Sequence, residues 1–255
     1  MALELIILSE DSASTSEETV FRLLLKIFRK LNNNFDENKV FRRPTDEHIT
    51  NGAIRGNLWK STRAMDQSKI IDLIKYVSTE LSRGRFVFWH IDGDRVWGNR
   101  RASENQQKFD EIILSAIKVK LGHLRESVNN FFLIVPFYSI EAWTYQNTIE
   151  ARSLSKIKYS SKDLDIIESW AKDPKLLDEI EKVAESICLR KHHNLELVTS
   201  QHFTLSPHLV AQKSLHATLT LLGSSDKLRK SLCDIQYAWC TTQGVGTDEI
   251  DGGQA

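Results

Sequence analysis

Short apolar runs that alternate with helical patterns constrain the fold of this chain more than any other feature. The runs cover residues 4–9, 85–91 and 131–135, and most of their positions are apolar. Runs of this length and composition are typical of strands that are buried on both faces, as in a parallel sheet with helices on each side. The chain therefore favours an α/β fold.

The segments between these runs carry amphipathic helical patterns. Apolar residues recur at helical spacing over 16–31, 70–81 and 109–121. The last two patterns stop at Gly84 and Gly122, and glycine is a common helix terminator. We interpret Lys39–Arg43 as a further short strand. The resulting order, βα(β)αβαβ, predicts a mainly parallel sheet with right-handed crossovers.

After Asn147 the pattern changes to helices without strands. We expect an α/β domain over residues 1–147 and a helical C-terminal subdomain over 148–240. Residues 241–255 are rich in Gly, Asp and Thr, so we expect a disordered tail there.

Composition excludes several classes of protein. The 34 basic residues balance 34 acidic ones, so no global field attracts nucleic acid or anionic lipid. The three cysteines lack CxxC spacing, which argues against disulfides and zinc and favours reduced core residues. No apolar stretch reaches the roughly 18 residues of a membrane span, and the N-terminus does not resemble a secretory signal. We expect a cytoplasmic protein that does not enter a membrane.

Acidic residues follow two of the predicted strands. Glu10 closes the first run, and Asp92 and Asp94 follow the run 85–91. The carboxyl ends of parallel strands meet at one edge of a sheet, and clustered carboxylates suit Mg²⁺ or Mn²⁺. His90 would lie on the same strand face as Asp92, either beside a metal or as a core histidine.

Each of these acids also has a simpler interpretation. Taken alone, Glu10 is more often a cap for the following helix than a metal ligand. Asp92-Gly93 between apolar runs could form a hairpin that pairs 86–91 with 95–97. Glu141 follows the run 131–135 in a first helical turn, where Ser139 would cap the helix and Trp143 would pack in the core.

The order of these residues resembles that of the Toprim-like nucleases, in particular the overcoming-lysogenisation-defect branch and related small prokaryotic proteins of unknown function found beside defence ATPases. The matching segments are Leu8-Ser-Glu10, His90-Ile-Asp92-Gly-Asp94, and Pro136 with Ile140-Glu141-Ala-Trp143. The resemblance covers about residues 4–147 and extends only loosely into the helical part.

This resemblance implies a Toprim-like, Rossmann-like domain in which Glu10, Asp92 and Asp94 bind Mg²⁺ or Mn²⁺ and are catalytic, with Asp11 and Glu141 in support. It implies a nuclease that cleaves DNA or RNA, with DNA the favoured substrate, acting as an effector of antiviral defence. It also implies a separately encoded ATPase as a partner, and it leaves oligomerisation open. The alternative is a non-catalytic Toprim-like subunit that regulates such an ATPase.

A nuclease needs basic groups near the phosphate, and no motif assigns one. The candidates for phosphate binding are Arg42, Arg43, Arg95, Arg100 and Arg101. A solvated basic loop explains them equally well. The sequence contains no phosphate-binding loop of the GxxxxGK[ST] type, so ATP hydrolysis by this chain is not expected. An aspartyl-phosphate phosphatase is disfavoured because Val96 stands where that motif requires Thr.

Overall fold

A computed structural model describes the residues on which the fold rests. They are 3–10, 15–43, 59, 61–93, 104–136, 139–158, 161–173, 176, 193–203, 205 and 213–233. Parts of the predicted helical subdomain, the predicted tail over 241–255, and Cys188 and Cys240 lie outside these residues.

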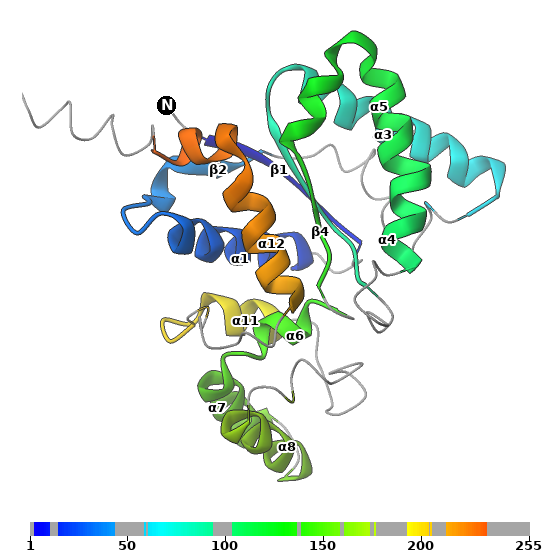
Figure 1. Ribbon diagram of the computed structural model, residues 1–255. Coiled ribbons are helices and arrows are strands. Elements are labelled where there is room, and N and C mark those ends of the chain that lie inside the picture. Colours follow the sequence, from blue (N-terminus) through cyan, green and yellow to red (C-terminus); the bar gives the residue numbers. More distant parts are fainter. Residues whose placement is uncertain are drawn as a thin grey trace, which may run out of the picture.

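A four-stranded sheet forms the centre of the protein, and all its strands are parallel. Its strands are β1 (Leu3–Ser9), β2 (Val40–Arg42), β3 (Phe86–His90) and β4 (Phe131–Ile134), in the order β2-β1-β3-β4 (Figure 1). The predicted α/β class and the short strand within 39–43 are confirmed. Strand β3 is buried along its whole length, as expected for a central strand with helices on both faces.

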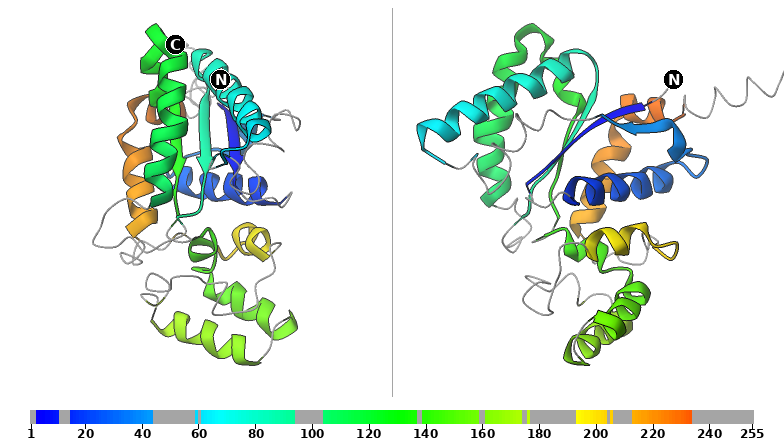
Figure 2. Two further views of the ribbon diagram at one scale, coloured as in Figure 1. Left: turned by 90° about the vertical axis from the view of Figure 1, so that its right-hand side faces the viewer. Right: turned by 180° about the vertical axis from the view of Figure 1, so that it is seen from behind.

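Helices cover both faces of the sheet, and alternate residues of β1, β3 and β4 enter different cores. On one face, Leu5, Ile7, Phe88 and Phe132 pack against α1 (Ser16–Leu31). On the other face, residues such as Ile6, Leu8 and Trp89 pack against α3 (Ala64–Ser82) and against the helices that follow β3. Two opposite views show these two layers of helices on either side of the sheet (Figures 1 and 2).

Two of the helices end where the sequence predicts. Helix α3 is followed by Gly84 at φ 80°, and the helical segment after β3 ends at Gly122 at φ 54°. These positive φ angles are strained for other residues, which explains glycine at both positions. The second segment is α4 (Glu104–Phe109), a π-helical turn η4 (Asp110–Leu114) and α5 (Ser115–Leu121), and the π-helical turn was not predicted.

Short 3₁₀ segments connect several of these elements. The segment η1 (Glu37–Lys39) precedes β2, and η5 (Gly122–Asn130) leads from α5 into β4.

Helices alone follow β4 in the described part of the chain. They are α6 (Glu141–Thr144), α7 (Thr148–Lys158), α8 (Ser161–Lys172), α11 (His193–Thr199), α12 (Lys213–Ser224) and a helical stretch over 226–233. Helices α11 and α12 contact α1, so their apolar residues join the core on that face of the sheet. Cys233 is a free, exposed thiol, so the prediction that it lies in the core was wrong.

Among the described helices, none has the length and apolar character that crossing a membrane requires.

Candidate functional site

The carboxyl ends of β1 and β3 lie at the topological switch point of the sheet, where the order of the strands reverses. From β1 the chain passes first to β2 on one side and then to β3 on the other. In open parallel sheets, ligands bind at the carboxyl ends of two strands whose connections diverge in this way. Glu10 follows β1 directly, and Asp92 follows β3 by two residues, so both lie at this position.

Glu10 connects the two strand ends through its backbone and its side chain. Its backbone N–H donates to the carbonyl oxygen of His90 over 3.0 Å, and its Oε2 accepts from the backbone N–H of Asp92 over 3.0 Å. The residue is only 7% exposed. Helix α1 begins after Thr15 without a side-chain cap, so the interpretation of Glu10 as its cap was wrong.

A buried histidine lies between Ser9 and Asp92. His90 Nδ1 is 3.1 Å from Ser9 Oγ, and its Nε2 is 3.4 Å from Asp92 Oδ1. The ring is fully buried, whereas the Asp92 side chain is 24% exposed. His90 is therefore a core residue, which is one of its two predicted roles, and its ring also contacts the carboxylate of Asp92 from the protein side.

Asn105 was not predicted as a site residue. It lies in the first turn of α4 and donates from Nδ2 to the carbonyl oxygen of Asp92 over 3.1 Å, and it is 9% exposed. This bond fixes the backbone of the acidic loop against the next helix. The predicted helical pattern began only at residue 109, so the sequence did not indicate that Asn105 lies in the first turn of a helix.

The hairpin interpretation of Asp92-Gly93 was wrong. Strand β3 pairs with β1 on one side and with β4 on the other, and both pairings are parallel. The ladder continues past the strand, because Ile91 N–H donates to the carbonyl oxygen of Ile134 over 3.1 Å. Strand β3 therefore has no open edge for a hairpin partner, and residues 95–97 themselves lie outside the described residues.

No protein-family model, curated protein or solved structure matches this chain. Support for a function therefore comes from the residues of the site.

Two of the three predicted metal ligands, Glu10 and Asp92, are joined by the hydrogen bond described above. Asp94 lies outside the described residues, as do Asp11, Arg95, Arg100 and Arg101. Within the described part of the chain, no group of three potential ligands comes together to hold a metal ion. A carboxylate offers about four lone-pair positions, so Glu10 can accept one N–H and still bind a cation. The oxygen donors of Glu10 and Asp92 fit Mg²⁺ or Mn²⁺, and Asp94, two positions after Asp92 in the sequence, would add a third carboxylate.

Glu141 belongs to a separate network at the start of α6. Its Oε1 accepts from Asn194 Nδ2 over 2.9 Å, and Asn194 Oδ1 accepts from Thr144 Oγ1 over 2.9 Å. These bonds join α6 to α11. Ile140, without a side-chain cap bond, precedes α6, so the prediction that Ser139 caps the helix was wrong. Trp143 is 1% exposed, as predicted for a core residue.

Arg42 and Arg43 lie at the level of Leu5, not at the carboxyl end of β1. Arg42 pairs with Leu5 in the sheet register, and Arg43 N–H donates to the Leu5 carbonyl oxygen. Glu10 is five positions after Leu5, or about 16 Å along a strand.

Both arginines have acidic partners. Arg42 contacts Glu18 at 3.3 Å. Arg43 contacts Glu4 at 3.2 Å and the buried Glu80 at 3.8 Å. Arg83 and Arg85 also bind Glu80, which is 3% exposed. Arg43 therefore belongs to a network that stabilises a buried carboxylate.

Proposed function

We propose that this protein is a Mg²⁺- or Mn²⁺-dependent nuclease whose metal ligands are Glu10, Asp92 and Asp94. The observation that carries the proposal is the hydrogen bond between the Glu10 carboxylate and the Asp92 backbone N–H at the topological switch point of the parallel sheet. This is where α/β proteins of this topology bind their ligands. The sequence resemblance to Toprim-like nucleases supports the same residues.

The protein's own groups would hold the two carboxylates in fixed positions. Glu10 is held by its backbone bond to His90 and by the N–H of Asp92. Asp92 contacts His90 on its buried side, and Asn105 holds its backbone through a hydrogen bond. Such preorganisation limits the rearrangement that ligand binding requires.

A bound Mg²⁺ or Mn²⁺ would polarise the phosphate and lower the pKa of an attacking water. The Asp92 side chain is 24% exposed, although its Oδ1 is buried, so a nucleic acid would approach it from the solvent side. Glu10 is more deeply buried, so it would contact the cation without contacting the substrate.

A cleavage assay tests this proposal. The purified protein is incubated with plasmid DNA, linear DNA and RNA, with Mn²⁺, with Mg²⁺ or with EDTA. Glu10→Gln and Asp92→Asn replace a carboxylate by an amide of the same shape. Asp72→Asn makes the same change on the exposed side of α3 and serves as the matched control.

We expect cleavage that requires the metal, is lost in Glu10→Gln and Asp92→Asn, and is retained in Asp72→Asn. Metal-dependent cleavage that persists in both site variants would show that another site is responsible.

A second candidate function is a non-catalytic subunit that regulates a separate ATPase. The ion pairs of Arg42 and Arg43 favour it, because these arginines would then stabilise the fold and would not bind phosphate. Co-purification of an ATPase, together with no cleavage under any metal condition, would favour this function over the first.

A further inference from the structure

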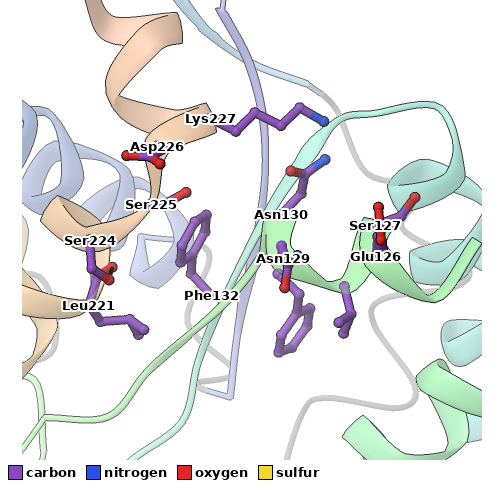
Figure 3. Close-up of a pocket in the computed structure, with 12 residues that line it drawn as sticks. Glu126, Ser127, Asn129, Asn130, Phe132, Leu221, Ser224, Ser225, Asp226 and Lys227 are labelled. Atoms are coloured by element: carbon purple, nitrogen blue, oxygen red, sulfur yellow. Dashed lines mark hydrogen bonds between the residues drawn. The ribbon is translucent and has the colours of Figure 1, made fainter.

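A pocket lies at the opposite end of the strands from Glu10 and Asp92. This pocket of about 720 Å³ opens between the end of η5, the start of β4 and the loop that follows α12 (Figure 3). Phe131 begins β4, so this pocket lies at the amino end of that strand, whereas Glu10 and Asp92 follow carboxyl ends. The pocket is within the size range of small-molecule sites, about 300–1,000 Å³.

Asn130 supplies a buried donor at this pocket. It is the last residue of η5 and is 1% exposed. Its side-chain Nδ2 has no hydrogen-bond acceptor within the described residues. Buried amide N–H groups in proteins nearly always have a partner, so an acceptor from outside the chain would satisfy it.

Lys227 supplies a positive charge near Asn130. Figure 3 shows the Lys227 side chain and the Asn130 amide at the same end of the pocket. The Lys227 ammonium lies 5.8 Å from the centroid of the Phe86 ring, and it forms no ion pair with any described residue. Two donors without an acceptor thus line the same part of the pocket.

The start of the helix over 226–233 adds to this preference for negative charge. Ser225 Oγ accepts from the backbone N–H of Leu228 over 3.3 Å, which marks Ser225 as the cap. The first N–H groups of the helix belong to residues that line the pocket, and a helix N-terminus favours anions. The carboxylate of Asp226 is bound by Arg229, which offsets its charge.

The remaining lining is partly apolar. Phe132 and Leu221 form one side of the pocket, and Leu221 is 45% exposed. Ser127 and Ser224 add hydroxyl groups, and Glu126 lies exposed at the rim.

We propose that this pocket binds a small organic anion, with its phosphate or carboxylate group at Asn130 Nδ2 and Lys227 Nζ and its apolar body against Phe132 and Leu221. The site is separate from the proposed metal site and does not depend on the proposed nuclease activity.

Calorimetry with the full-length protein tests the proposal. The probes are inorganic phosphate, phenyl phosphate and benzoate, with benzyl alcohol as the uncharged comparison. All titrations contain EDTA, so that no metal can link a phosphate to Glu10 and Asp92. The variants are Lys227→Met and Asn130→Asp, and Lys230→Met removes the same charge one turn along the helix outside the pocket lining.

We expect phenyl phosphate or benzoate to bind at millimolar concentrations or below, and benzyl alcohol not to bind. Lys227→Met should weaken the binding about tenfold or more, because a hydrogen bond to a charged group is lost. Asn130→Asp should weaken it at least as much by placing a carboxylate near the anion. Lys230→Met should bind like the unmodified protein.

Three results would overturn the proposal: no binding of any anionic probe, equal binding by Lys227→Met and the unmodified protein, or equal weakening in Lys227→Met and Lys230→Met. Inorganic phosphate binding as tightly as phenyl phosphate would overturn the role of Phe132 and Leu221. Lys227 is exposed, so its variant remains informative if Asn130→Asp fails to fold.

Discussion

The proposed metal site predicts that Mn²⁺ stabilises the folded protein through Glu10. A ligand that binds only the folded state adds about 2.7 kcal/mol at a concentration 100 times its dissociation constant. For a domain of this size, each kcal/mol raises the melting temperature by roughly 2–4 °C. Saturating Mn²⁺ should therefore raise the melting temperature by about 5–10 °C.

The variant Glu10→Gln separates metal binding from the structural role of this residue. A glutamine side-chain oxygen can still accept the N–H of Asp92, as Glu10 Oε2 does over 3.0 Å. In EDTA the free energy of unfolding should therefore change by no more than about 1 kcal/mol. The Mn²⁺-dependent rise should be lost, because one anionic ligand is gone.

Scanning calorimetry of the unmodified protein, Glu10→Gln and Asp72→Asn, each in EDTA and over a series of Mn²⁺ concentrations, measures both quantities. Asp72→Asn should retain the full Mn²⁺ effect. An equal rise in the unmodified protein and in Glu10→Gln would refute the assignment of Glu10 as a ligand. This test needs no cleavage activity, so it also applies to a non-catalytic subunit that retains the metal.

Two further predictions concern stability. Trp143→Phe should lower the free energy of unfolding by about 1–2 kcal/mol, measured in urea, because the indole N–H that donates to Ser214 Oγ over 3.0 Å is lost. Burial raises the pKa of Asp110 above 3.8, and Lys118 partly opposes the shift. The folded state thus holds this proton more tightly than the unfolded state, so stability falls as pH rises through the interval above 3.8. Asp110→Asn should be more stable than the unmodified protein at pH 7, and urea titrations should find this advantage lost below that interval.

Local patterns predicted the elements that carry the site. The apolar positions of α1 and α3 recur at helical spacing, and β3 is an uninterrupted run that proved to be buried on both faces. Gly84 and Gly122 marked the ends of helical segments because the chain there adopts positive φ angles. These features depend on residues close together in the sequence.

The contacts that define the site depend on residues far apart in the sequence. Glu10 and Asp92 are 82 positions apart, and Glu141 and Asn194 are 53 apart. No local pattern shows that Glu10 binds the backbone after β3, whereas Glu141 binds a side chain in α11. The sequence therefore grouped Glu141 with the acidic site, although its carboxylate binds Asn194 in α11.

The position of β3 in the sheet explains why sequence alone left Asp92 ambiguous. An Asp-Gly pair after an apolar run is compatible both with a hairpin and with the end of a central strand. The choice depends on whether β3 has an open edge, and β1 and β4 fill both of its edges. Because β3 cannot pair with a third strand, the chain after Ile91 must leave the sheet at the carboxyl ends of the strands. That exit brings the backbone N–H of Asp92 to the carboxylate of Glu10, so the same topology that rules out the hairpin also assembles the acidic pair.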